Sequence, residues 1–333
     1  MKQKSQRPIF LETQNKMDIL DKFLEVLRSK RNFDAKTYID KKTDAINSFF
    51  RENNLDSAVV GISGGIDSAV VYALLNEASK KENSPISKVL GLIMPIFGNG
   101  TTNQLLAKDK AKNFCERICE RNHSMIFHIC DLTKSYEAYL ESSAWGFLKV
   151  PFSNGQVASI VRTPCLYHHA AQLQDAGYKS IVVGTTNRDE GSYIGFFGKA
   201  SDAMVDLQPI ADIHKSEVYK IAEILGVSRE IIEAKPAGDV HDGRTDEEMI
   251  GAPYWFVELY LLMKQENTSL SLHGALPGER LRQIIPEIYD NVTFKNYSEK
   301  IEEIHNKNSH KYKVGSPARF IDVMERKIEG GWS

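Results

Sequence analysis

Hydrophobic residues follow two spacings that alternate along the middle of the chain. Short apolar runs predict buried strands at residues 57–62, 88–96, 124–130 and 179–185. Apolar residues that recur every three or four positions predict helices between them, at residues 68–79, 102–121, 132–143 and 156–176. Because strands that alternate with helices form right-handed units, the pattern predicts an α/β fold, a doubly wound parallel sheet with helices on both faces.

The two flanks of this core carry helical spacing as well. Residues 17–30 and 35–53 predict a pair of N-terminal helices packed on the core. Residues 254–266 and 278–306 predict helices ahead of an irregular, basic C-terminal tail. We therefore expect one compact domain with an N-terminal helical segment, a core, and a C-terminal helical extension with its tail, at residues 1–55, 56–266 and 267–333.

Two stretches between the apolar segments predict loops. Residues 144–155 lie between two helical patterns, and residues 234–252 are polar and rich in glycine. The second stretch is long for a simple connection, and long surface loops commonly carry function. We therefore expect residues 234–252 to form a mobile functional loop.

Composition narrows the class of protein without choosing a function. The chain has 333 residues, of which 42% are hydrophobic and 26% charged, values that are ordinary for a globular protein. The formal charge of −2 gives no general attraction to nucleic acid, so we expect no nucleic-acid partner. No apolar stretch approaches the roughly 20 residues that span a bilayer, and the first residues lack the apolar core of a signal peptide. We therefore expect a cytoplasmic protein with no membrane partner.

The number and spacing of the cysteines also favour the reducing environment of the cytoplasm. The chain has only four, Cys115, Cys119, Cys130 and Cys165, with no Cys-x-x-Cys pair and too few for a disulfide framework. A role as small apolar residues is favoured over metal binding or redox chemistry. His168 and His169 are likewise interpreted as helix residues without a metal, because no third ligand stands at a useful spacing.

The stretch VVGISGGIDS, residues 59–68, is the first that predicts chemistry. It places a Ser-Gly-Gly loop between a buried strand and an apolar helix, and Gly64 and Gly65 let the backbone pass close to a ligand. Backbone N–H groups at the start of a helix favour anions, and the hydroxyls of Ser63 and Ser68 add donors. The carboxylate of Asp67 would repel phosphate unless a cation lay between them. Phosphate with a divalent metal is therefore favoured over an ordinary glycine turn.

Residues 184–227 form the second chemical stretch. Thr185 follows a buried strand, and Glu190 supplies a second carboxylate that can face Asp67. Two carboxylates with phosphate oxygens suit Mg²⁺, which prefers oxygen ligands. Lys199 and Lys215 are candidate contacts to phosphate or substrate, although each alone is typical of a solvated surface charge, and Asp212 can be simply a helix N-cap. Lys215 begins an amphipathic helix, where its charge opposes the helix dipole unless an anion lies nearby.

The order of these motifs resembles a known family. SGGIDS is similar to the pyrophosphate loop of the N-type ATP pyrophosphatases, which split ATP between the α and β phosphates. GTTNRDE, GFFGK, Asp202, Asp206, the Leu-x-Pro of residues 207–209 and the helix of Lys215, in that order, resemble ammonia-dependent NAD synthetase over roughly residues 40–315. This resemblance implies an adenine nucleotide alpha hydrolase-like fold, usually a homodimer. It also implies a ligase: the carboxylate of deamido-NAD attacks ATP, pyrophosphate leaves, and ammonia displaces AMP to give NAD⁺.

The resemblance implies a role for each matching residue. ATP-binding residues would be Gly61, Ile62, Ser63, Gly64, Gly65, Ile66, Asp67, Ser68, Thr185 and Lys215. Metal ligands would be Asp67 and Glu190, substrate-binding residues would be Arg162, Lys199, Asp206, His310 and Lys311, and catalytic residues would be Asp67, Asp202 and Lys215. The expected small molecules are ATP, Mg²⁺, ammonia, and deamido-NAD or another carboxylate. No glutaminase module is recognised, so ammonia would arrive free or from a separate glutaminase partner.

The chain departs from the family pattern mainly on the acceptor side. An arginine that contacts deamido-NAD is replaced by Ile160, a glycine-rich Gly-Asp-Gly-Gly becomes residues 201–204 with Met204, and a threonine of the mobile loop becomes Ala237. An extra residue before GFFGK leaves open whether Asp189 or Glu190 is the second metal ligand. Two alternatives therefore stay open beside NAD synthesis: a ligase for a different small carboxylate, and a nucleotide-binding relative without activity. A tRNA-modifying enzyme is disfavoured by the acidic balance and the unpaired cysteines.

Overall fold

A single parallel sheet positions the rest of the protein. The computed structural model describes residues 9–97, 104–142, 151–234, 244–270, 286–313 and 319–320. Within them, six strands pair in the order β3-β2-β1-β4-β5-β6, and every pair is parallel. The strands are β1 (Ser57–Gly61), β2 (Lys88–Ile93), β3 (Met125–Ile129), β4 (Ser180–Val183), β5 (Leu207–Gln208) and β6 (Arg319–Phe320). The predicted doubly wound sheet is confirmed.

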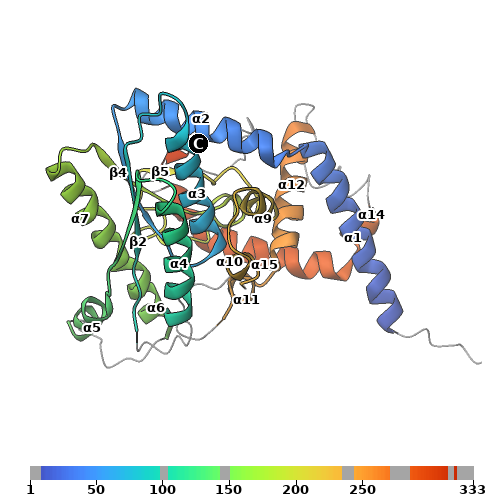
Figure 1. Ribbon diagram of the computed structural model, residues 1–333. Helices are drawn as coiled ribbons and strands as arrows, with labels where there is room; N and C mark the ends of the chain where they lie inside the picture. Colours follow the sequence, from blue (N-terminus) through green and yellow to red (C-terminus); the bar gives the residue numbers. More distant parts are fainter. Residues whose placement is uncertain are drawn as a thin grey trace, which may run out of the picture.

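Helices cover both faces of the sheet (Figure 1). One face carries α2 (Ala35–Glu52), α3 (Ile66–Lys80), α4 (Gln104–Cys119), α9 (Lys215–Ile224) and α10 (Arg229–Ile232). The other face carries α5 (Thr133–Glu141), α6 (Pro151–Ile160) and α7 (Arg162–Asp175). Side chains of β1 alternate between the two apolar clusters, since Ala58 and Val60 face the first and Val59 faces the second.

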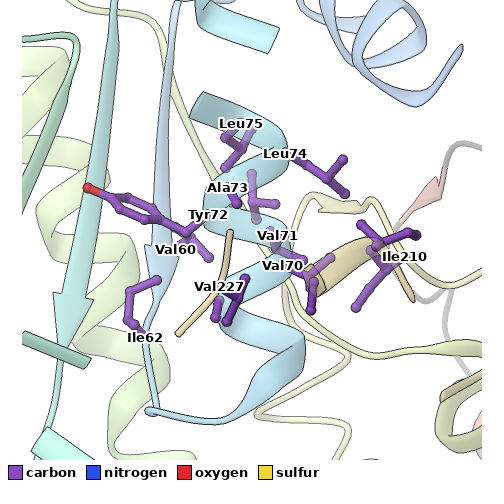
Figure 2. Packing of buried hydrophobic residues seen from close by; sticks show 14 of the residues in the cluster. Val60, Ile62, Val70, Val71, Tyr72, Ala73, Leu74, Leu75, Ile210 and Val227 are labelled. Atoms are coloured by element: carbon purple, nitrogen blue, oxygen red, sulfur yellow. The ribbon is translucent and has the colours of Figure 1, made fainter. Parts of the chain in front are cut away.

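The first apolar cluster holds the helix that follows β1. Along α3, Val70, Val71 and Leu74 are completely buried. They pack with Val60 from β1 and with residues such as Ile210 from beyond β5 (Figure 2). This burial of a whole helix fixes the position of its first turn against the end of β1, which is where the glycine loop lies.

A third cluster joins both ends of the chain away from the sheet. Its helices are α1 (Ile9–Arg31), α12 (Tyr254–Leu270), α14 (Pro286–Tyr289) and α15 (Val292–Asn308), on the right in Figure 1. Three further short helices are α8 (Arg188–Gly191), α11 (Asp246–Ile250) and α16 (His310–Lys313). None of the described helices combines the length and apolarity that a membrane crossing requires.

Two expectations about helices and loops in the middle of the chain were wrong in part. The helix expected over 156–176 is divided at Val161 into α6 and α7, and α6 begins at Pro151, so residues 151–155 of the expected loop are helical. Proline fits the first turn of a helix, where its missing N–H is not needed, which suits both Pro151 and Pro164. Residues 143–150 lie outside the described part of the chain.

The C-terminal region also differs from its prediction. The single helix expected over 278–306 is two helices in the described residues, because Asn291 interrupts the run and caps α15 by accepting from the N–H groups of Thr293 and Phe294. The tail expected to be irregular contributes β6, which extends the sheet beside β5.

Candidate active site

The glycine loop lies where the sheet changes direction. From β1 the chain winds outward through β2 and β3, and then returns to place β4 on the other side of β1. In such sheets the crevice at the carboxyl ends of the two central strands is the usual ligand site. The loop after β1 and the loop after β4 both lie at this edge of the sheet, because each follows the carboxyl end of its strand.

The loop itself is tight and depends on one glycine. Gly64 has φ of 84°, and a Cβ atom there would lie 2.5 Å from the carbonyl oxygen of Ala107 on α4. The Oγ atom of Ser63 accepts from the N–H of Gly65 and lies 3.1 Å from the Oγ atom of Ser68. Gly65 then caps α3 without a side-chain bond. The loop is therefore folded by its own hydroxyls and presents the start of a helix to the crevice.

Two carboxylates and one ammonium meet at this point. The Nζ atom of Lys215, at the start of α9, lies 2.6 Å from Oδ2 of Asp67 and 3.2 Å from Oε1 of Glu190. Lys215 is only 4% exposed. The anion expected beside Lys215 is thus supplied by the two proposed metal ligands. The structure brings together these three residues, which the sequence places in separate motifs.

Asn187 and Tyr254 complete this cluster and were not predicted. The Nδ2 atom of Asn187 donates to Oδ1 of Asp67 at 3.0 Å and to Oε1 of Glu190 at 2.8 Å. The hydroxyl of Tyr254 donates to the same Glu190 oxygen at 2.8 Å, and its ring lies 4.7 Å from the ammonium of Lys215. Tyr254 is buried and contacts the site. Asn187 was identifiable as part of GTTNRDE, whereas Tyr254 stands in no motif.

The two neighbouring acids, Asp189 and Glu190, point to different partners. Asp189 is fully buried and binds the Nδ1 atom of His214 at 2.6 Å and the backbone N–H of Lys215 at 2.7 Å. It therefore holds the start of α9, while Glu190 is the acid that faces Asp67. Burial raises the pKa of Asp189 to about 7, although the hydrogen bond from the backbone N–H of Lys215 acts in the opposite direction.

The electrostatics of the cluster suit a divalent cation. Burial raises the pKa of Glu190 to about 7; the ammonium of Lys215 opposes this, and the carboxylates of Asp67 and Asp246 add to it. Burial alone would lower the pKa of Lys215, but Asp67 and Glu190 raise it above its ordinary value. Three carboxylates around one ammonium leave an excess of negative charge in a poorly solvated place. Their hard oxygen atoms fit Mg²⁺.

Asp212 lies behind the cluster and is not the N-cap of α9, which is His214. Its Oδ1 atom accepts from Nζ of Lys42 at 3.0 Å and from the hydroxyl of Tyr38 at 2.7 Å. The interpretation of Asp212 as an N-cap was therefore wrong. Its partners tie α9 to α2 and so fix the helix that carries Lys215.

Lys311, which was expected to bind the acceptor, and Asp202, which was expected to be catalytic, both make contacts within the loop of residues 195–202. Lys311 donates to the carbonyl oxygens of Gly195 at 3.0 Å and Phe197 at 2.6 Å. Asp202 accepts from the N–H of Gly198 at 2.9 Å. Burial lowers the pKa of Lys311, and Asp202 opposes this effect. Asp202, just after the GFFGK loop, and Lys311, near the C-terminus, therefore both hold this loop.

The remaining candidates are four residues expected to bind the substrate, Thr185, which was expected to bind ATP, and the three positions that depart from the family pattern. Asp206 accepts from the N–H of Val182 at 2.7 Å, and Arg162 donates from Nε to the carbonyl of Met94 at 3.1 Å. Lys199 and His310 are exposed, Met204 is 48% exposed, and Thr185 and Ile160 are half-buried. Ala237 lies outside the described residues. The roles assigned to these candidate residues stay predictions.

The fold and the site define a class of protein: an α/β nucleotide-binding protein with a glycine loop and an acidic, lysine-bridged cluster at the switch point of its sheet. Within that class, residues 38–314 match the family model for NAD synthase, and the chain belongs to this family. The predicted resemblance is confirmed.

Named relatives and solved structures agree with this family. The NH(3)-dependent NAD(+) synthetase of Thermococcus kodakarensis is 34% identical over 224 residues, which cover 67% of this chain and 79% of that protein. The NH(3)-dependent NAD(+) synthetase of Methanocaldococcus jannaschii is 33% identical over 256 residues, which cover 76% of this chain and 92% of that protein. The solved structure of NMN synthetase from Francisella tularensis superimposes with a TM-score of 0.64 at 24% sequence identity. The match covers 86% of this chain and 100% of that chain, and it supports the assigned fold.

Proposed function

We propose that the protein is an ammonia-dependent NAD⁺ synthetase, a ligase that adenylates the carboxylate of deamido-NAD and replaces AMP with ammonia. The observation that carries this proposal is the cluster of Asp67, Glu190 and Lys215 at the end of the glycine loop. The names of the relatives support the same acceptor. The products are NAD⁺, AMP and pyrophosphate.

The residues of the loop act by binding and neutralising charge. Backbone N–H groups at the start of α3 hold phosphate oxygens, and the ammonium of Lys215 offsets the negative charge that develops on the leaving pyrophosphate. Asp67 and Glu190 would hold Mg²⁺, which supplies further positive charge to the same phosphates. The protein needs no nucleophile of its own, because the carboxylate of the substrate attacks the α-phosphorus. The side chain of buried Asn187 donates to both Asp67 and Glu190 and so keeps the two carboxylates oriented.

Pyrophosphate release from ATP and Mg²⁺, with NAD⁺ formation followed in parallel, tests this function. Deamido-NAD and ammonium should give equal amounts of AMP and NAD⁺. Asp67→Ala should abolish both while leaving the fold intact, and the exposed Asp44→Ala should serve as the control. Turnover with nicotinate mononucleotide but not deamido-NAD would instead support the ligase for a different carboxylate. Full activity in Asp67→Ala would contradict the assignment of the site.

Two further features of the proposal concern assembly and ammonia. We propose a homodimer, which sedimentation velocity can measure, and an ammonia supply that is free or comes from a separate glutaminase. In the second case, glutamine should replace ammonium only when a glutaminase is added. A cytoplasmic location and the absence of a nucleic-acid partner stay predictions from composition.

A further inference from the structure

Three side chains that the sequence separates meet beside the sheet. Cys130 follows the last residue of β3, and Cys165 and His169 lie four positions apart on α7, on one face of that helix. The Sγ atom of Cys130 lies 3.6 Å from Nε2 of His169, and Sγ of Cys165 lies 3.7 Å from Nδ1 of the same ring. All three residues are half-buried. Two cysteines that lie 35 positions apart in the sequence thus stand beside one histidine.

The spacing of the donor atoms fits a small metal ion. One ligand atom from each residue lies within 4.8 Å of the other two, and among the described residues this is the group of three that has such a geometry. In a tetrahedral zinc site with Zn–S of about 2.3 Å and Zn–N of about 2.0 Å, sulfur and nitrogen are about 3.6 Å apart. Cys130 and His169 already have that separation.

The histidine ring is oriented as a metal ligand. Its Nδ1 atom lies 2.8 Å from the backbone carbonyl oxygen of Cys165. Because a carbonyl oxygen only accepts, Nδ1 must carry the proton, and Nε2 therefore keeps its lone pair toward Cys130. Histidines that ligate metals commonly donate their second N–H to a carbonyl in this way. The ring of His128, which is two residues before Cys130, lies 6.1 Å from that of His169.

We propose that Cys130, Cys165 and His169 bind a soft divalent cation, with Zn²⁺ as the preferred ion. Two thiolates and a neutral imidazole are soft donors, in contrast to the carboxylates of the Mg²⁺ site. Binding replaces two S–H bonds by two Zn–S bonds and releases two protons to solvent, so that the site gains no net charge. The fourth position belongs to water or to His128. This inference does not depend on the proposed function.

A metal ion would use all three side chains of the group, whereas a disulfide would use only the two thiols. The ion would join the end of β3 to α7, whose first residues donate to the sheet and to the 195–202 loop through Arg162 and Thr163.

Cobalt titration of the full, reduced chain after chelation tests the site. We expect one equivalent of Co²⁺ to produce thiolate-to-cobalt absorption in the near ultraviolet, two protons to be released, and Zn²⁺ to displace the cobalt. Cys130→Ser, Cys165→Ser and His169→Gln should each weaken binding by at least about tenfold. Cys119→Ser is the matched control, because this half-buried thiol lies on α4 outside the group.

The titration of the unaltered protein decides the proposal without any variant. Absence of the thiolate band in that protein would overturn it, as would an undiminished band in Cys130→Ser and Cys165→Ser variants that keep the circular dichroism of the parent. A Cys130–Cys165 disulfide formed under mild oxidation, together with no cobalt binding, would assign the pair to redox chemistry instead.

Discussion

The Nζ atom of Lys215 lies 2.6 Å from Oδ2 of Asp67, although 148 residues separate them in the sequence. Each stands in the first turn of its helix, α9 or α3. A lysine at the start of a helix opposes the helix dipole, and burying its charge is costly unless it is paired. The contacts with Asp67 and Glu190 offset both effects. The placement of this lysine is therefore determined by the site and not by the helix.

Replacing Lys215 by Met keeps the length of the side chain and removes its charge. Asp67, Glu190 and Asp246 would then lack their ammonium partner, and the leaving pyrophosphate would lose one source of neutralisation. We expect Lys215→Met to lower the rate of pyrophosphate release by about 10²–10³-fold. Lys220→Met on the exposed face of the same helix is the control and should retain activity. A full rate in Lys215→Met would remove this residue from the mechanism.

The raised pKa of Glu190 predicts that metal binding depends on pH. Protons compete with Mg²⁺ for this carboxylate, whose pKa is about 7. As pH falls below about 7, the Mg²⁺ concentration for half-maximal activity should rise by up to about tenfold per pH unit. Activity assays in which Mg²⁺ is titrated at several values between about pH 6 and 8 measure this concentration. Glu190→Gln should need far more Mg²⁺ at every pH and lose this dependence, whereas exposed Glu223→Gln should behave as the parent.

The same pKa has an opposite consequence for the stability of the metal-free protein. Glu190 has a folded-state pKa of about 7 against an ordinary value of 4.5, so the folded state holds more protons than the unfolded state in that interval. The contribution of Glu190 to stability should therefore fall as pH rises from 4.5 to about 7. Mg²⁺ should restore the stability that is lost. Chemical unfolding at several pH values, with and without Mg²⁺, measures this gain. A gain in the free energy of unfolding that does not change with pH would show that Glu190 is not involved.

The four longest strands, their parallel arrangement and the site motifs were predictable, because each rests on a local pattern. Buried parallel strands such as β1 are nearly continuous apolar runs, and a glycine loop between such a strand and a helix has few structural meanings. Asp67, Glu190 and Lys215 each stood near a predicted strand end or helix start. The topology of a doubly wound sheet then brings those ends to one edge.

What sequence reasoning missed depends on tertiary contacts alone. The strand β6 has two residues and pairs only because the end of β5 is available. Tyr254 contacts Glu190 from a helix of the distant third cluster, and Cys130 meets His169 across the surface of the sheet. The choice between Asp189 and Glu190 is a question of rotation within one turn of α8. A one-dimensional spacing does not contain that rotation.

A buried ion pair predicts how firmly α1 is attached. Arg31, the last residue of α1, donates from Nε to Oε1 of Glu217 at 2.5 Å and from Nη2 to the carbonyl of Asp212 at 2.8 Å. Arg31→Met would leave the carboxylate of Glu217 buried without its cation, at a cost of about 3–5 kcal/mol in the free energy of unfolding. The double variant Arg31→Met/Glu217→Gln should recover part of this loss. Urea unfolding measures both, and additive effects would show that the pair is not coupled.

Gly64 provides the most selective test of the loop. Alanine at this position must adopt φ of 84°, at about 1–2 kcal/mol, and its Cβ would also lie 2.5 Å from the carbonyl oxygen of Ala107. Gly177 has a similar φ of 94°, but a Cβ atom added there would meet no other atom within 4 Å, and it lies far along the sequence after α7. Both variants should therefore lose a similar amount of stability from backbone strain. Only Gly64→Ala should also displace the loop and raise the KM for ATP, by about tenfold or more if the displacement costs a further 1.4 kcal/mol of binding. Equal KM values in the two variants would mean that the loop tolerates the displacement and that ATP phosphates are held elsewhere.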